Sequence, residues 1–197
     1  MNKVFVDLEY LCPSVSDKVD TIIKKILKER FNVQENQYSY DEEETLDYLE
    51  KYEKVKDLLF SSKNKRFSNI LNYDELYSIE NINTKRMEYV FNTYQDICFI
   101  CYFNSVRELN AKTRLLSEFG ENVTVLPIPY KMDERRVNKA KFIKEFCKLP
   151  ELASCVLLDN SYTALVEWDR EGGLIDTNSS EEAQLTQEEI NSYVKKK

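Results

Sequence analysis

The sequence contains no histidine among its 197 residues. This absence excludes Ser-His-Asp and Cys-His catalysis, in which a histidine accepts the proton of the nucleophile. It also excludes every metal site that uses an imidazole ligand. Any chemistry that the chain performs must therefore use carboxylates, lysine, tyrosine, serine or cysteine.

The chain also lacks an apolar run that approaches the roughly 20 residues needed to span a bilayer. Its N-terminus lacks the basic segment, the long apolar stretch and the small-residue cleavage site of a secretory signal. Five cysteines, an odd number without repeated spacing, fit reduced thiols better than a disulfide framework. We therefore expect a soluble, cytoplasmic protein with no membrane partner.

Positive charge is in deficit, because 28 Lys and Arg stand against 35 Asp and Glu and leave a net charge of −7. Sequence-independent binding of duplex nucleic acid depends on neutralising many phosphates with Lys and Arg, so no duplex partner is expected. Hydrophobic residues make up 42% of the chain and include 13 Tyr and 10 Phe, which favours an ordered globule.

The hydrophobic pattern predicts strands that alternate with helices over most of the chain. Short apolar runs, typical of strands buried in a sheet, lie at residues 3–9, 97–102, 123–126, 155–158 and 173–175. Apolar residues at helical spacing predict helices at about 14–31, 41–60, 85–94, 106–119, 137–147 and 162–170, and a last helix from 186.

This order predicts an α/β fold with a doubly wound parallel sheet, interrupted after its first strand by a helical insertion. The core would comprise residues 1–11 and 95–197, and the insertion residues 12–94. In such sheets, ligands bind at the carboxyl ends of the strands. Two acidic strand ends are the first candidates: Asp7 with Glu9, and Asp159 with Asn160.

Both strand ends resemble motifs of the haloacid dehalogenase-like (HAD) hydrolases. The segment Val4-Phe-Val-Asp7-Leu-Glu9-Tyr-Leu11 resembles the first motif, an apolar strand followed by Asp-x-Asp. The segment from Val156 to Gly173, which contains Asp159-Asn160 and later Trp and Gly-Gly, is similar to the fourth motif of small nucleotidase-like members. The resemblance covers nearly the whole chain and implies a HAD-like core with a helical cap.

The resemblance also implies a mechanism. Asp7 would attack phosphorus and form an aspartyl-phosphate, and Glu9 would be the acid/base residue, with a pKa raised by a neighbouring acid. Asp7, Glu9 through its backbone carbonyl, Asp159 and the neighbouring Asn160 would surround Mg²⁺, which prefers oxygen ligands. Lys139 would neutralise the phosphate.

Other candidates come from the loops around this edge. Lys131 is a second candidate for the phosphate-neutralising lysine. Asn104 and Ser105 stand near the place where the family has a Ser or Thr that holds a phosphate oxygen. Either residue could instead cap the helix that begins at Val106, a common use of both residue types.

Departures from the family pattern leave two functions open. The first is a Mg²⁺-dependent phosphohydrolase that acts on a small phosphate monoester such as a nucleotide, with the insertion as a cap that excludes water. The second is a catalytically impaired HAD-like protein that binds a phosphorylated ligand or regulates another process. Glu9 in place of the family's second Asp, and Asn160 in place of an acid, motivate the second function. A different α/β fold with an acidic strand-end pocket is a third possibility.

Overall fold

The computed structural model describes residues 3–33, 42–61, 64–120, 123–133 and 135–176. Within these ranges, five parallel strands form one sheet in the order β3-β2-β1-β6-β7. They are β1 (Lys3–Asp7), β2 (Ile97–Phe103), β3 (Thr124–Pro129), β6 (Cys155–Leu158) and β7 (Leu174–Ile175). The short strands β4 (Lys131–Met132) and β5 (Arg135–Arg136) pair antiparallel as a separate ribbon. The prediction of a parallel sheet is confirmed; the helix expected from residue 186 lies outside the described residues.

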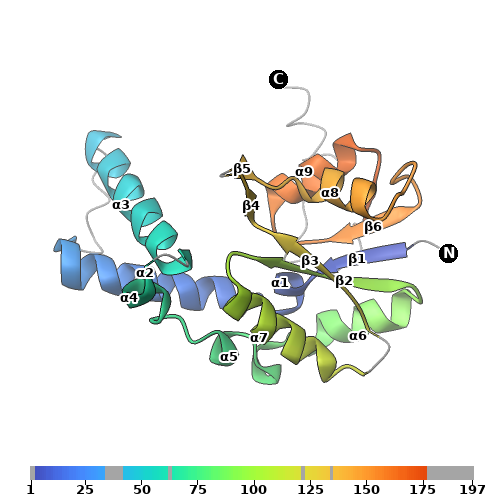
Figure 1. Cartoon of the computed structure of the whole chain (residues 1–197), viewed down its shortest axis with the longest axis horizontal. Helices are drawn as coiled ribbons and strands as arrows, with labels where there is room; N and C mark the ends of the chain where they lie inside the picture. The colour runs from blue at the N-terminus through green and yellow to red at the C-terminus, as the bar shows by residue number, and fades with distance from the viewer. Residues whose placement is uncertain (1–2, 34–41, 62–63, 121–122, 134, 177–197) are drawn as a thin grey trace.

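Helices cover both faces of the sheet, as Figure 1 shows. Helices α6 (Thr84–Thr93) and α7 (Val106–Ser117) lie on one face, and α8 (Lys139–Phe146) and α9 (Tyr162–Arg170) lie on the other. Successive side chains of a strand point to opposite faces, so each strand supplies both layers: Val4 and Val6 pack on the α6 and α7 side, and Phe5 on the α8 and α9 side. The topology is compatible with a Rossmann-like fold.

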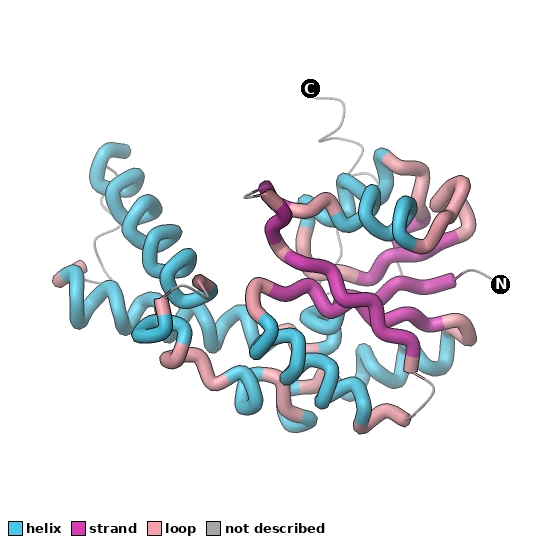
Figure 2. The backbone as a smooth tube through the Cα atoms, viewed as in Figure 1, coloured by secondary structure: helices cyan, strands magenta, loops and turns pink. Residues whose placement is uncertain are grey.

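The helical segment after β1 begins with α1 (Leu8–Leu11) and α2 (Ser14–Phe31). It continues through α3 (Glu42–Phe60), α4 (Lys65–Ser68), α5 (Tyr73–Leu76) and the 3₁₀ turn η1 (Ile79–Asn81). The outer parts of α2 and α3 project away from the sheet (Figures 1 and 2), and the Tyr52 hydroxyl of α3 donates to Asp20 Oδ1 of α2 at 2.9 Å.

The predicted insertion at residues 12–94 is not structurally separate from the sheet. Buried residues of α2 and α3, such as Leu27 and Leu59, belong to one continuous hydrophobic cluster with Val4 and Phe99 of the sheet. Its last helix, α6, lies directly against the sheet and leads into β2, so only the outer parts of α2 and α3 extend outward (Figure 1). None of the helices among the described residues is long and apolar enough to cross a membrane.

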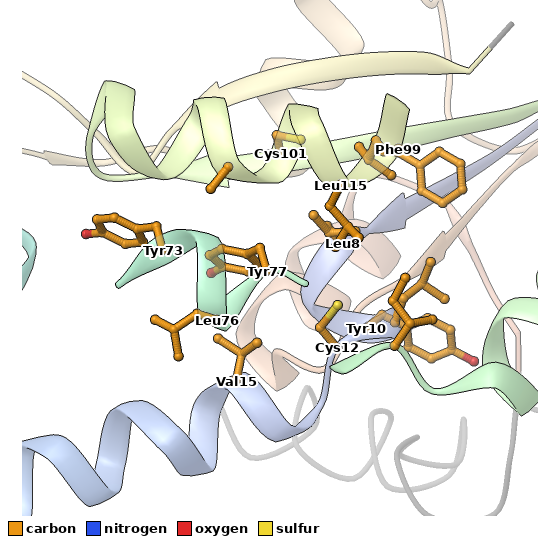
Figure 3. Close-up of a cluster of buried hydrophobic side chains, with 14 of the residues drawn as sticks. Leu8, Tyr10, Cys12, Val15, Tyr73, Leu76, Tyr77, Phe99, Cys101 and Leu115 are labelled. Atoms are coloured by element: carbon orange, nitrogen blue, oxygen red, sulfur yellow. The ribbon is translucent and has the colours of Figure 1, made fainter. Parts of the chain in front are cut away.

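The first strand is shorter than its apolar pattern predicts. It ends at Asp7 rather than at residue 9, because the Asp7 carboxylate accepts a hydrogen bond from the backbone N–H of Glu9 and caps α1. The chain therefore turns away at the end of the strand, and the next residues pack in the cluster shown in Figure 3. The next helix, α2, follows Pro13 and has no side-chain cap at its N-terminus.

Close packing explains the Trp and Gly-Gly sequence at the end of α9. The indole N–H of Trp168 donates to the carbonyl of Leu174 at 3.1 Å, and the ring packs edge-on against Phe5 with centroids 5.7 Å apart. A Cβ built on Gly173 would lie 2.1 Å from Trp168 Nε1. The motif therefore has a structural role, because only glycine leaves room for the buried indole.

A substitution at Gly173 should accordingly be far more costly than one at its neighbour. Gly173→Ala should lower the free energy of unfolding by about 3 kcal/mol or more, because the fully buried indole has to move. Gly172 has a φ of 80° and open space around its Cβ position, so Gly172→Ala should cost only about 1 kcal/mol of backbone strain. Urea unfolding of both variants measures the two losses of stability. Equal losses would show that the contact with the Trp168 indole does not determine the cost of a substitution at Gly173.

Candidate functional site

Two buried acids lie side by side at the carboxyl ends of neighbouring parallel strands. Strands β1 and β6 are parallel neighbours, with Val6 paired in register with Leu158. Asp7 directly follows Val6, and Asp159 directly follows Leu158; the two aspartates are only 2% and 3% exposed. The parallel arrangement therefore brings together two carboxylates more than 150 positions apart in the sequence.

Lys139 joins these two carboxylates. Its ammonium lies 2.5 Å from Asp7 Oδ2 and 2.6 Å from Asp159 Oδ2, and 4.3 Å from the centroid of the Tyr102 ring. The lysine is the first residue of α8, which Asn138 caps. Burial acts to lower the pKa of Lys139, but the charges of the two aspartates outweigh it and raise that pKa, so the side chain stays charged.

The remaining oxygen of each aspartate is also fixed. Asp7 Oδ1 accepts from the backbone N–H of Glu9 at 2.9 Å, and Asp159 Oδ1 accepts from the backbone N–H of Ser161 at 2.7 Å. Burial raises the pKa of Asp159 to about 6; the charge of Lys139 opposes this shift, and the charge of Asp7 adds to it. One ammonium thus stands between two buried acids, which leaves the group net negative when both are ionised.

The raised pKa of Asp159 predicts a pH dependence. The folded protein holds this proton more tightly than the unfolded chain, so the stability contributed by the group is complete below pH 3.8 and is lost as the pH rises through about 6. In the metal-free protein, the Asp159 carboxyl ¹³C resonance should titrate near pH 6. Lys139→Met should raise this pKa further, because the ammonium favours the carboxylate. Titration near pH 4, or a fall in the pKa after Lys139→Met, would contradict this electrostatic description.

Glu9 lies at the wall of the same region, with its side chain 48% exposed. Its Oε1 atom accepts hydrogen bonds at 3.0 Å from both the Tyr77 hydroxyl and the Lys112 ammonium. Desolvation acts to raise the pKa of Glu9, but the charge and hydrogen bond of Lys112 outweigh it and lower that pKa. The shift is opposite in direction to the raised pKa expected from the family role, and it favours the carboxylate.

Lys112 and Glu108 form a buried ion pair behind Glu9 that the sequence analysis missed. Their side chains are 0% and 2% exposed, and the ammonium lies 2.9 Å from Glu108 Oε1. Lys112 also donates to the carbonyl of Tyr102 at 2.5 Å. The one available signal was an i,i+4 Glu–Lys pair on a face of α7 that otherwise carries Ala111 and Leu115.

Asn160 connects the segment after β6 to α1 and to α6 through its side-chain amide. Its amide nitrogen donates to the backbone carbonyl of Glu9 at 2.7 Å, and its amide oxygen accepts from Arg86 at 3.1 Å. Arg86, from α6, also donates to the carbonyl of Tyr10 at 2.8 Å. The two groups expected near Mg²⁺, the Asn160 amide and the Glu9 carbonyl, therefore already bond to each other. The geometry favours a positioning role for both groups.

The three candidates from the loops, Asn104, Ser105 and Lys131, each have a partner other than Asp7 or Asp159. Ser105 caps α7, since its hydroxyl accepts from the backbone N–H of Glu108 at 3.2 Å. The backbone N–H of Asn104 donates to Glu108 Oε2 at 2.8 Å, so this residue also has a local partner. Lys131 is half exposed and pairs with Asp57 of α3 at 3.6 Å. The structure does not bring Lys131 to Asp7 and Asp159 as it does Lys139.

A cavity of about 470 Å³ opens above the Lys139 group. Lys139, Asp159 and Glu9 line it, whereas Asp7 does not line it and contacts it only through Lys139. A separate cavity of about 330 Å³ along α2 contains none of these residues. The lining of the larger cavity is completed by Cys12, Pro13, Ser16, Lys56, Tyr102, Tyr130, Arg136, Asn160, Ser161 and Thr163.

Asp7 and Asp159 supply part of the oxygen ligands that a hard cation such as Mg²⁺ needs. Among the residues that the structure describes, no group of three or more Cys, Asp or Glu side chains surrounds a metal position. However, Asp7 and Asp159 already direct one oxygen each at a single cation, the Lys139 ammonium. Mg²⁺ usually takes only one or two carboxylates and completes its shell with waters and a substrate phosphate, so two aspartates suffice.

Comparison of the chain with protein-family models, with curated proteins and with solved structures gives no significant match.

Proposed function

We propose that the chain is a Mg²⁺-dependent phosphohydrolase that removes the phosphate from a small monoester through an aspartyl-phosphate on Asp7. The observation that carries the proposal is the position of Lys139, which bridges Asp7 and Asp159 at the carboxyl ends of two parallel strands and faces a cavity. This edge is where open α/β sheets bind ligands. The cavity volume of about 470 Å³ suits a small molecule such as a nucleotide.

The chemistry proceeds in two displacements. An oxygen of Asp7 attacks phosphorus, the bond from phosphorus to the leaving oxygen breaks, and that oxygen takes a proton from a solvent water, which leaves a hydroxide ion. Water then attacks the aspartyl-phosphate, its proton passes through the Glu9 carboxylate to that hydroxide, and inorganic phosphate leaves with Asp7 restored. The lowered pKa of Glu9 suits it to the second step, in which it accepts a proton.

Lys139 has two tasks in this scheme. Its ammonium covers Asp7 in the free protein, and an incoming phosphate draws the ammonium toward its own oxygens and uncovers the nucleophile. The same charge then stabilises the negative charge that develops on the transferring group. Mg²⁺, held by Asp7 and Asp159 together with waters and the phosphate, would supply further neutralisation of that charge. The helices α2 and α3 would act as a cap that excludes water.

Two features of the site favour the alternative, in which a catalytically impaired protein binds a phosphorylated ligand or regulates another process. Asp7 is covered by Lys139, and the Glu9 carboxylate is already engaged by Lys112 and Tyr77. A site in this state binds phosphate through Lys139 without attack. Binding of inorganic phosphate by calorimetry, with no turnover of any ester, would favour this function over hydrolysis.

Purified protein with Mg²⁺, assayed with p-nitrophenyl phosphate and with a panel of nucleoside monophosphates, tests the proposal. We expect phosphate release that EDTA stops and that Asp7→Asn abolishes. The matched control is Asp96→Asn, the same chemical change at the N-terminal side of β2, where Asp96 pairs with Lys3 at 3.0 Å. Wild-type rates no higher than those of Asp7→Asn with every ester would reject hydrolysis.

A further inference from the structure

We propose that Lys112 is a positioning residue that holds the Glu9 carboxylate at the wall of the cavity and, through Glu108, holds the loop after β2. This inference assigns a role to a lysine outside the cavity, and its kinetic readout rests on the proposed function. A structural readout tests it independently of turnover.

Lys112 lies at the centre of a set of bonds that joins several segments. Its fully buried ammonium contacts Glu9 Oε1 at 3.0 Å, Glu108 Oε1 at 2.9 Å and the carbonyl of Tyr102 at 2.5 Å. These partners come from the start of α1, from α7 and from the end of β2. An ammonium has three N–H donors, so all its donors are used and its position is fixed. The Glu9 carboxylate is therefore attached to the rigid helix α7.

Glu108 extends the same set of bonds to the next loop. Its Oε1 atom accepts from Lys112, and its Oε2 atom accepts from the backbone N–H of Asn104 at 2.8 Å. The Asn104 amide lies 3.4 Å from the same oxygen. The loop that follows β2 thus depends on the two residues that hold Glu9, and it lies at the sheet edge where the proposed substrate phosphate binds.

Tyr77 connects the helical segment to this group. Its hydroxyl donates to Glu9 Oε1 at 3.0 Å and lies 3.4 Å from Glu108 Oε1, and its ring centroid lies 4.7 Å from the Lys112 ammonium. Figure 3 shows Tyr77 between α7 above and the α1–α2 segment below. A displacement of the helical segment would therefore change the position of Glu9 directly.

Stability alone does not account for such a group. Buried ion pairs gain little relative to apolar residues of similar volume, because desolvation offsets most of the attraction. What the pair supplies is geometry, and misplacement of a reacting group by about 1 Å can cost on the order of 10²-fold in rate. The position of Glu9, rather than the stability of the fold, is therefore the property that Lys112 should control.

The test uses the mildest change first. Tyr77→Phe removes one of the two hydrogen bonds that hold Glu9 Oε1 and keeps the ring. We expect kcat to fall about 10-fold, with KM nearly unchanged, because a hydrogen bond to a charged group is worth only a small part of the full effect of Glu9. The matched control is Tyr94→Phe, which removes a hydroxyl bonded to a carboxylate, that of Asp176, outside this site. In a Glu9→Gln background, Tyr77→Phe should have no further effect, because its target is already altered.

The double variant Glu108→Gln/Lys112→Met tests the pair without leaving a buried unpaired charge. We expect kcat to fall about 10²-fold at a temperature where circular dichroism shows the fold intact. A crystal structure of this variant should show the Glu9 carboxylate and the Asn104 loop displaced. A purely structural role predicts a lower melting temperature with unchanged kcat and an unchanged Glu9.

The two failures are distinguishable. If the wild-type protein hydrolyses no ester, the proposed function fails, and the crystal structure of the double variant still decides whether Lys112 positions Glu9. If hydrolysis is observed but Glu9 stays in place and kcat is unchanged in the double variant, the positioning role is overturned. Full additivity of Tyr77→Phe with Glu9→Gln would also overturn it.

Discussion

Lys139→Met should lower the free energy of unfolding by about 3–5 kcal/mol, because the variant leaves the buried carboxylates of Asp7 and Asp159 without their shared cation. Methionine has a similar length and no charge, so the loss reports the ammonium rather than a cavity. Urea unfolding at pH 7.5, where Asp159 of the wild type is ionised, measures the effect. At pH 5 the loss should be smaller, since protonation removes one of the two charges.

Mg²⁺ should restore part of this stability. With the ammonium gone, the two aspartates offer an unneutralised site for a hard cation, so millimolar Mg²⁺ should raise the melting temperature of Lys139→Met more than that of the wild type. The control is Lys144→Met, which breaks the partly exposed pair of Lys144 with Glu171 and should cost about 1 kcal/mol or less. Similar losses for both variants, or no response of Lys139→Met to Mg²⁺, would contradict the assignment of the cation position.

Asp7→Asn should reduce kcat by about 10⁴-fold or more, because an amide cannot act as the nucleophile and loss of a nucleophile removes most of an enzyme's rate enhancement. The variant should fold, since asparagine keeps the shape of the side chain and an oxygen that can accept from the backbone N–H of Glu9. Single-turnover kinetics measure the rate, and circular dichroism checks the fold.

The nucleophile is also testable without turnover. Beryllofluoride mimics the phosphoryl group of an aspartyl-phosphate, so BeF₃⁻ with Mg²⁺ should stabilise the wild-type protein and leave Asp7→Asn unaffected in calorimetry. Asp96→Asn should respond like the wild type, because Asp96 lies at the opposite end of the strands. Residual hydrolysis in Asp7→Asn at more than a few per cent of the wild-type rate would assign the nucleophile elsewhere.

The parallel sheet and the convergence of Asp7 and Asp159 could be predicted because both depend on local patterns. Short apolar runs mark the strands, and acids at the ends of parallel strands share one edge of a sheet. The family resemblance predicted a role for Lys139, because this lysine lies at the start of the helix that precedes the strand now labelled β6. In each case the relevant residues stand next to an element that the sequence pattern identifies.

The network around Glu9 could not be predicted in this way. Lys112 and Glu9 are 103 positions apart, and their contact depends on how α7 packs against α1. Tyr77 lies between residues 60 and 85, a polar segment whose hydrophobic residues are too weakly periodic to predict a helix or a strand. The role of Asn160 also depends on a distant residue, Arg86, which engages its amide oxygen. Such contacts follow from tertiary packing, and no spacing in the sequence encodes them.

A crystal structure of the wild-type protein with Mg²⁺ and BeF₃⁻ would show whether Asp7 is the nucleophile and whether Asp7 and Asp159 bind one cation. We expect one Mg²⁺ ligated by side-chain oxygens of Asp7 and Asp159, beryllium bonded to Asp7, and the Lys139 ammonium moved from Asp7 onto a fluoride. An Mg²⁺ ion bound elsewhere, or an Asp7 that keeps its contact with Lys139 and carries no beryllium while the ligands are present in excess, would contradict it.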